Sequence, residues 1–237
     1  MKDSSRGLIG NSLLQALTRR DFARLEPLLE EVPLVSHQML SVAAEKIAFA
    51  YFPLRGMVSL VRHMADGSYA EVGLVGREGF VGVSLLHGVT RSPIEAMVQG
   101  EGAALRIRTK DLLAAVGRKP DLKAQLLAYA ELAYIQATQT AACNVRHTLH
   151  QRLLRWLLEA DDRLQQDDMV LGQDFLAMML GVRRAGVSVG LRDVSAAGLI
   201  KTGIRSIRIL DRPGMEAAAC ECYAATRTES ERLLPAA

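Results

Sequence analysis

The spacing of apolar residues changes twice along the chain and divides it into three unlike parts. Between residues 9 and 30 apolar side chains recur at helical spacing and Pro33 follows, which predicts two short helices. From about Leu34 to Arg108 the pattern changes to short strand-like runs, and nine of the nineteen glycines fall in this stretch. Many short strands with frequent turns favour an antiparallel roll or jelly roll. Within it, Asp66-Gly67 predicts a hairpin with a type I′ turn.

The third part begins with a long helical pattern. From Asp121 to about Asp168 the chain has neither Gly nor Pro, and a helix over residues 121–145 would span about 38 Å. Apolar positions recur three or four apart at Leu122, Leu126, Ala130, Ala133, Ala137 and Ala141, and the stripe AYAELAYIQATQTAAC (residues 128–143) is rich in Ala and Thr. Small residues let two helices approach closely, so the stripe favours a parallel homodimer seam. A helix that only lies against the roll remains the alternative, and capping near Asn144 is expected to split the run.

The last third has the pattern of a winged helix-turn-helix. An acidic stretch from Glu159 to Asp168 is expected to be a linker between domains. Two short amphipathic helices then meet at Gly181, and residues 199–210 predict two strands around Gly203, the wing. Between Arg183 and Arg212 there are seven basic residues and two acidic ones. This local charge favours phosphate binding, with an ordinary solvated basic face as the alternative.

Composition and residue content narrow the class of protein. The 237 residues are 49% hydrophobic and 23% charged with a net charge of +3, which is typical of a folded domain or two. We expect no membrane segment and a cytoplasmic location, since no apolar run is long enough for a span. No catalytic motif is found, so an enzyme is not expected. The three cysteines, Cys143, Cys220 and Cys222, suggest no disulfide framework, and no metal site is expected because four convergent ligands are not evident.

The order of these parts resembles the CRP/FNR superfamily of bacterial transcription regulators. The resemblance covers about residues 13–212 and rests on four segments: YFPLRGMVSLV, MADGS, EVGLVGREGFVG and QDFLAMMLGVRRAGVSVGLRDVSAAGLI. It implies an α+β fold with an N-terminal antiparallel β-roll or jelly roll like that of cyclic-nucleotide-binding domains, a long dimerisation helix and a C-terminal winged helix-turn-helix. The corresponding domains are residues 1–120, 121–145 and 146–237.

The resemblance also implies how the chain would bind DNA. Arg184 matches the family arginine that reads guanine, and Arg183 stands at the helix start where the family often has a capping Ser. Ala185 and Val189 replace polar base readers, and small apolar groups there are suited to thymine methyls. Four more residues complete the expected interface, all as phosphate contacts: Ser188, Arg192, Lys201 and Arg205.

An effector site is less well matched. Gly82 matches the glycine of the family's phosphate cassette, but Val83 replaces the glutamate that accepts the ribose hydroxyl. Arg91 and Ser92 resemble the second pair of the cassette, and Thr138 falls near the hydroxyl that meets the base. Cyclic AMP therefore stays open as a ligand but is disfavoured. The oxygen-sensing branch of the family holds an iron–sulfur cluster with an N-terminal group of cysteines. No cysteine precedes Cys143 in this sequence, so the resemblance implies no such cluster here.

The sequence thus predicts a sequence-specific transcription regulator, a homodimer on a near-palindromic operator of double-stranded DNA, modulated by an effector that the sequence does not identify. Contact with RNA polymerase is left open. The alternative is a cyclic-nucleotide-like small-molecule sensor that acts through protein partners, with a degenerate DNA-reading helix.

Overall fold

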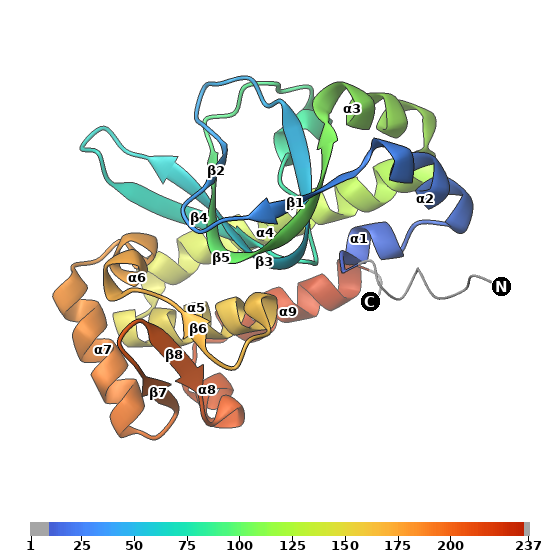
Figure 1. Ribbon diagram of the computed structural model, residues 1–237. Coiled ribbons are helices and arrows are strands. Elements are labelled where there is room, and N and C mark those ends of the chain that lie inside the picture. The colour runs from blue at the N-terminus through green and yellow to red at the C-terminus, as the bar shows by residue number, and fades with distance from the viewer. Residues whose placement is uncertain (1–9, 235–237) are drawn as a thin grey trace.

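The computed structural model describes residues 10–234 and places a curled antiparallel sheet beside a helical C-terminal domain, with one long helix running past both (Figure 1). The sheet has the strand order β1-β5-β3-β4, and β2 also pairs with β5. The N-terminal part comprises α1 (Ser12–Gln15), α2 (Arg19–Leu25), η2 (Glu26–Leu28), β1 (Glu30–Leu34), β2 (Met39–Ser41), β3 (Phe49–His63), β4 (Tyr69–Val75), η3 (Val83–His87), β5 (Glu95–Arg108) and α3 (Thr109–Arg118). The predicted α+β fold with an N-terminal roll is confirmed.

Two strands of the roll are longer than their sequence pattern predicts. The runs YFPL and MVSLVRHM form the single strand β3, and IEAMV and AALRI form β5. Gly56 lies inside β3 with a φ of +89°, and a Cβ atom there would stand 2.6 Å from the carbonyl oxygen of Gly100. Glycines therefore bend the paired strands where we expected turns between them, because only Gly tolerates this backbone and this close approach.

The hairpin after β3 forms where Asp66-Gly67 predicts one, but with a different turn. The Met64 backbone N–H donates to Ser68 O and the Gly67 N–H donates to Met64 O, which leaves three residues in the loop. Gly67 has a φ of +84°, and Asp66 is not among the residues with positive φ. The type I′ prediction is therefore wrong, and the loop is a three-residue connection with Gly in the left-handed position.

The long helix and its successor are separated by a well-defined cap. Helix α4 (Pro120–Arg146) is followed closely by α5 (Leu149–Leu164). The N-cap of α5 is Thr148, whose hydroxyl forms a capping box with Gln151. The break thus comes at Thr148 and not near Asn144. The acidic stretch is not a linker either, since Glu159, Asp161 and Asp162 lie within α5.

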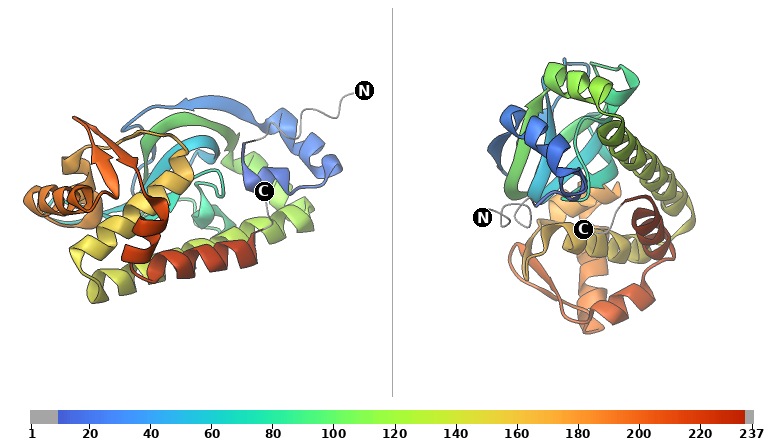
Figure 2. Two further views of the ribbon diagram at one scale, coloured as in Figure 1. Left: turned by 90° about the horizontal axis from the view of Figure 1, so that it is seen from below. Right: turned by 90° about the vertical axis from the view of Figure 1, so that its right-hand side faces the viewer.

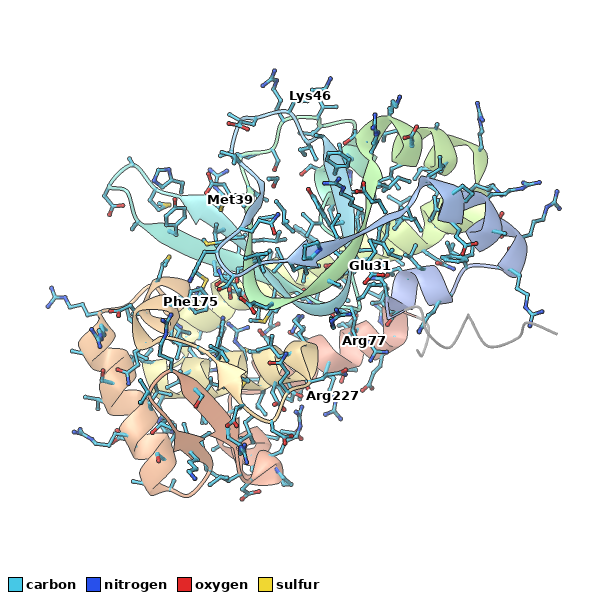
Figure 3. All side chains as sticks on the ribbon, viewed as in Figure 1. Glu31, Met39, Lys46, Arg77, Phe175 and Arg227 are labelled. Atoms are coloured by element: carbon cyan, nitrogen blue, oxygen red, sulfur yellow. The ribbon has the colours of Figure 1, made fainter. Side chains whose placement is uncertain are left out.

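The C-terminal domain packs around α5, and its core continues into the sheet, because Met57, Val61, Leu74 and Met97 belong to the same buried cluster. It contains β6 (Met169–Val170), α6 (Gln173–Leu180), α7 (Arg184–Ala196), β7 (Ile200–Thr202), β8 (Ser206–Ile209), α8 (Arg212–Ala218) and α9 (Cys222–Leu233). Trp156 is fully buried there and meets Phe175 edge-on at 5.9 Å between ring centroids. Figure 3 shows Phe175 where this domain meets the sheet. Helix α9 then runs back along α4 (Figure 2), and Leu234 joins the core of the roll.

None of the helices within residues 10–234 combines the length and the apolar character that crossing a membrane requires.

Candidate nucleic-acid interface and ligand cavity

The predicted helix-turn-helix is formed by α6 and α7. Gly181 ends α6 in the left-handed conformation with a φ of +62°, and the Val182 N–H donates back to the carbonyl of Ala177. This is the glycine C-cap that lets a helix stop sharply without a steric penalty. Val187, Leu191 and Val194 are buried in the domain core, as their spacing predicts. The opposite face of α7 is consequently turned to solvent.

The exposed face of α7 carries three of the expected DNA contacts. Arg183 is the N-cap of α7, and Arg183, Arg184 and Arg192 are all exposed. The Arg184 Nε lies 3.4 Å from Asp174 Oδ1, with the two side chains 64% and 77% exposed. An ion pair this open contributes little to stability, so Arg184 remains free to exchange it for a base or phosphate acceptor. Val189 is also exposed, on the same helix.

Ser188 is placed differently from the arginines. Its side chain is half-buried, and its Oγ donates to Gln173 Oε1 over 2.6 Å, which links α7 to α6. The hydroxyl thus has a partner inside the domain. In the structure Ser188 holds the two helices together, and the expected phosphate contact would require it to leave or share this bond.

The wing is the hairpin β7–β8, with β6 paired on the other side of β8. Lys201 and Arg205 are exposed on it, and Ile204 at its tip is fully exposed, a residue that sequence reasoning did not single out. Two other basic residues of this region are neutralised: Arg208 pairs with Asp168, and Arg212 pairs with Asp161, Asp162 and Glu216.

The acidic stretch therefore neutralises part of the basic region and leaves the rest exposed. Seven basic residues lie between Arg183 and Arg212, and two of them, Arg208 and Arg212, form these ion pairs. The other five are those that the resemblance assigns to DNA: Arg183, Arg184, Arg192, Lys201 and Arg205. Their positive charge lies on α7 and the wing, where a duplex would approach.

Helix α4 presents two different faces. The predicted seam over residues 128–143 divides between two faces: Tyr129 and Leu132 are buried in the core of the roll, whereas Tyr134, Thr138 and Ala141 are exposed. The exposed stripe of α4 also carries the apolar residues Leu127 and Val145, whose side chains stay exposed within residues 10–234. It runs at the alternating spacing of four and three that a two-helix seam requires: Leu127, Glu131, Tyr134, Thr138, Ala141 and Val145.

A cavity of about 300 Å³ lies between the roll and α4. Gly82, Val83 and Ser92 line it from the roll, as the resemblance implies. Apolar and aromatic residues of α4, including Tyr129, Ala133 and Tyr134, close it from the other side. The sequence did not identify these helix residues as part of a cavity wall, because a helix face that packs directly against the roll has the same spacing of apolar residues.

Two expected effector residues do not line this cavity. Arg91 is exposed, and its guanidinium donates to the carbonyl of Ala44 over 3.0 Å. Thr138 is exposed too, and its hydroxyl donates to the carbonyls of Tyr134 and Ile135 in its own helix. Within the described part of the chain, neither Arg nor Lys lines the cavity, and the basic side chain in its wall is that of His87.

The roll and the C-terminal domain meet through a buried polar contact. The Trp156 indole N–H of α5 donates to Glu71 of β4 over 2.7 Å, and Ser59 donates to the same carboxyl over 2.7 Å. Burial raises the pKa of Glu71 to about 7, against the two hydrogen bonds that lower it. Glu71 is therefore a titratable group at the junction of the two regions.

Comparison with known proteins agrees with this architecture. Residues 151–218 match the model of the Crp-like helix-turn-helix domain. The fold is similar to that of FixK2 from Bradyrhizobium japonicum, with 19% identity over 81% of this chain and 98% of that one and a TM-score of 0.70. It is also similar to a transcriptional regulator of the crp/fnr family from Eubacterium rectale, with 12% identity over 88% and 98% of the two chains and a TM-score of 0.69.

A third similar structure is the c-di-GMP-responsive global regulator CLP of Xanthomonas campestris, with 14% identity over 82% of this chain and 100% of that one and a TM-score of 0.65. None of the curated protein sequences compared with this chain matches it.

Proposed function

We propose that this chain, a CRP/FNR-type protein by its fold and by its Crp-like helix-turn-helix domain, is a homodimer that regulates transcription by binding a near-palindromic operator. The observation that carries the proposal is the set of exposed basic side chains on α7 and the wing. It coincides with the positions that the family uses to read and hold DNA.

The division of labour within this set follows from placement. Arg184 in the first turn of α7 is suited to the O6 and N7 acceptors of guanine, which an arginine contacts with two parallel hydrogen bonds. Arg183, Arg192, Lys201 and Arg205 are suited to phosphates, which fix the register of the protein on the duplex. The exposed side chain of Val189 meets a thymine methyl, and Ser188 supports α7 through Gln173.

Dimerisation uses the exposed stripe of α4. Leu127, Tyr134 and Val145 cannot leave water within one chain, and a second copy in parallel would cover all three. Two α7 helices related by the resulting two-fold axis would enter successive major grooves about 34 Å apart. Tyr134 belongs both to this stripe and to the cavity wall, so an occupied cavity would act directly on the seam.

The effector that best fits the cavity is a small neutral molecule with a large apolar surface. The lining offers aromatic rings, aliphatic groups, a few hydroxyls such as that of Ser92 and the imidazole of His87, but no Arg or Lys to bind an anion within the described residues. The cavity therefore favours a ligand of a different kind from c-di-GMP, to which the Xanthomonas regulator responds.

The test of the proposal is a gel-shift titration with promoter fragments bound in the cell. Arg184→Ala is expected to weaken specific binding by about 5- to 150-fold, equivalent to ~1–3 kcal/mol. The matched control is Arg20→Ala, which removes one exposed positive charge from α2, far from α7. Sedimentation of the same samples reports the dimer.

Two outcomes would contradict the proposal. Equal losses for Arg184→Ala and Arg20→Ala would mean that only net charge matters. A stable dimer that binds no DNA under any ligand condition would favour the alternative, a sensor that acts through protein partners.

A further inference from the structure

Four side chains with metal-ligand chemistry converge at the C-terminal end of α4. They are Cys143, His147, Cys220 and Cys222, and their ligand atoms all lie within 4.8 Å of one another. Cys143 and His147 are one helical turn apart, while Cys220 and Cys222 stand at the start of α9, which packs on α4. No metal site is expected from the sequence, because four convergent ligands are not evident in it, and the fold brings these four together from distant segments.

Two of the distances between ligand atoms match those of a tetrahedral centre, and all four atoms lie within 4.8 Å of one another. The Sγ atoms of Cys143 and Cys220 are 3.6 Å apart, and Cys222 Sγ lies 3.5 Å from His147 Nδ1. Zinc binds thiolate sulfur at about 2.3 Å and imidazole nitrogen at about 2.0 Å, so ligands at the corners of its tetrahedron are separated by roughly 3.5–3.8 Å. A disulfide requires sulfurs about 2.0 Å apart, which the first distance excludes for this arrangement.

We infer that these residues form a structural zinc site with three cysteine ligands and one histidine ligand. The three cysteines are almost fully buried and His147 is 15% exposed, so the four protein ligands would close the coordination sphere without room for a reacting molecule. Sulfur-rich tetrahedral sites of this kind select zinc over the harder cations magnesium and calcium.

The surroundings of the cluster orient its ligands. His147 Nε2 lies 3.2 Å from Glu221 Oε2, which leaves Nδ1 as the ring nitrogen directed at the sulfurs. Metal-binding histidines commonly donate their second nitrogen to a carboxylate in this way. The amide of Gln139 donates to Cys222 Sγ over 2.9 Å, a bond that favours a sulfur bearing negative charge.

The local charge also fits an occupied site. Three thiolates and one Zn²⁺ carry a net charge of −1, because each cysteine gives up its proton on binding. Arg152 and Arg155 are close enough to Cys143 to interact with it electrostatically. The Nε atoms of both arginines are buried and have no hydrogen-bond partner within residues 10–234. Arg155 also pairs with Glu159, and Arg152 donates to the carbonyl of Leu180. An anionic centre would add a further partner for both cations.

The position of the site gives it a role in the architecture. It joins the last turn of α4 to the start of α9, directly beside the connection of His147 and Thr148 that leads into the helix-turn-helix domain. A bound ion would therefore fix the direction in which α5 leaves α4.

The test uses the full-length chain, stripped with a chelator under reducing conditions and reloaded with Zn²⁺ or Co²⁺. We expect one zinc per chain by elemental analysis, a lower melting temperature after stripping, and a cobalt spectrum with sulfur-to-metal charge transfer and intense tetrahedral bands. Cys222→Ser and His147→Ala each remove a ligand and should weaken zinc binding by more than the roughly 10- to 100-fold typical of losing an outer partner. The matched control is His150→Ala, which removes an exposed histidine that lies outside the cluster.

A further variant keeps the result interpretable if a ligand substitution disturbs folding. Glu221→Gln retains all four ligands, changes a side chain that is 77% exposed, and is expected to weaken zinc binding by about 10- to 100-fold. The inference is overturned if the reloaded wild-type chain holds no zinc, if its cobalt form shows weak octahedral bands, or if Cys143 and Cys220 are found joined as a disulfide in the freshly reduced and reloaded protein.

Discussion

The exposed basic surface on α7 and the wing and the cavity beside α4 both lie where the resemblance implies binding sites, yet they keep the expected residues to very different degrees. On α7 and the wing, the charged residues stand exposed where the resemblance places them. In the cavity, Val83 replaces an acceptor, Arg91 is turned to the Ala44 carbonyl, and aromatic residues of α4 fill the wall. The proposed DNA interface therefore keeps the residues that the resemblance implies, whereas the cavity does not. The indole of Trp156 contacts Glu71 at the junction of the C-terminal domain and the roll.

The largest expected effect comes from Trp156→Ala. This side chain is buried in the C-terminal core, packs against Phe175 and donates to Glu71, so its loss should lower the free energy of unfolding by about 3–5 kcal/mol. Denaturation in urea followed by circular dichroism measures this, since the chain has no other tryptophan to report by fluorescence. Phe52→Ala, in the core of the roll, is the control for the other region.

If the two regions are joined as tightly as their contact suggests, both variants should unfold in one transition. A loss below about 1 kcal/mol for Trp156→Ala, within the range of surface substitutions, would contradict the assignment of this residue to the core.

Glu71→Gln is expected to act on the junction in a pH-dependent way. Because the pKa of Glu71 is raised from 4.5 to about 7 in the folded chain, the folded state keeps a proton that the unfolded state releases. The stabilisation is complete below pH 4.5 and is lost as the pH rises through 7. Since Gln does not titrate, the variant should gain on the wild type by about 1–3 kcal/mol between pH 5 and pH 8, as measured by urea unfolding. Parallel pH profiles would refute this account of the junction.

The smallest expected effect distinguishes the cavity from the cyclic-nucleotide sites that it resembles. Cyclic AMP should leave the melting temperature unchanged, whereas indole, a neutral aromatic probe, should raise it by binding the folded chain. Thr138→Ala should alter neither result, because the Thr138 hydroxyl donates only to carbonyls of its own helix. Ala133→Leu fills the cavity and should abolish the response to indole. If cyclic AMP raises the melting temperature of the wild type but not of Thr138→Ala, the cavity is a cyclic-nucleotide site and this account of it is wrong.

The helix-turn-helix could be predicted because its signals are local. Gly181 marks the end of one helix, and Val187, Leu191 and Val194 mark the buried face of the next within a dozen residues. The bends of the roll could not be predicted in the same way. Gly56 looks like a turn residue, and only its contact with Gly100, far along the chain, shows that the strand continues through it.

The choice of partner for each face of α4 and the cysteine cluster were also beyond the sequence. Two apolar stripes share the helix, and periodicity alone does not tell which one the roll covers. Cys143 and Cys220 are 77 positions apart and meet only because α9 folds back on α4. Short-range spacing therefore identified the exposed charges and missed the groups brought together by packing.

The return of α9 toward the roll has a mechanical consequence. The helix-turn-helix domain is anchored to the rest of the molecule at both of its ends, by α5 leaving α4 and by Leu234 seated in the opposite core. A domain attached at one point can rotate about that point, whereas a second attachment restricts the rotation. A rotation of α7 relative to the roll would require α9 to slide along α4 or Leu234 to leave the core of the roll. The packing of α9 and Leu234 therefore limits how far α7 can move.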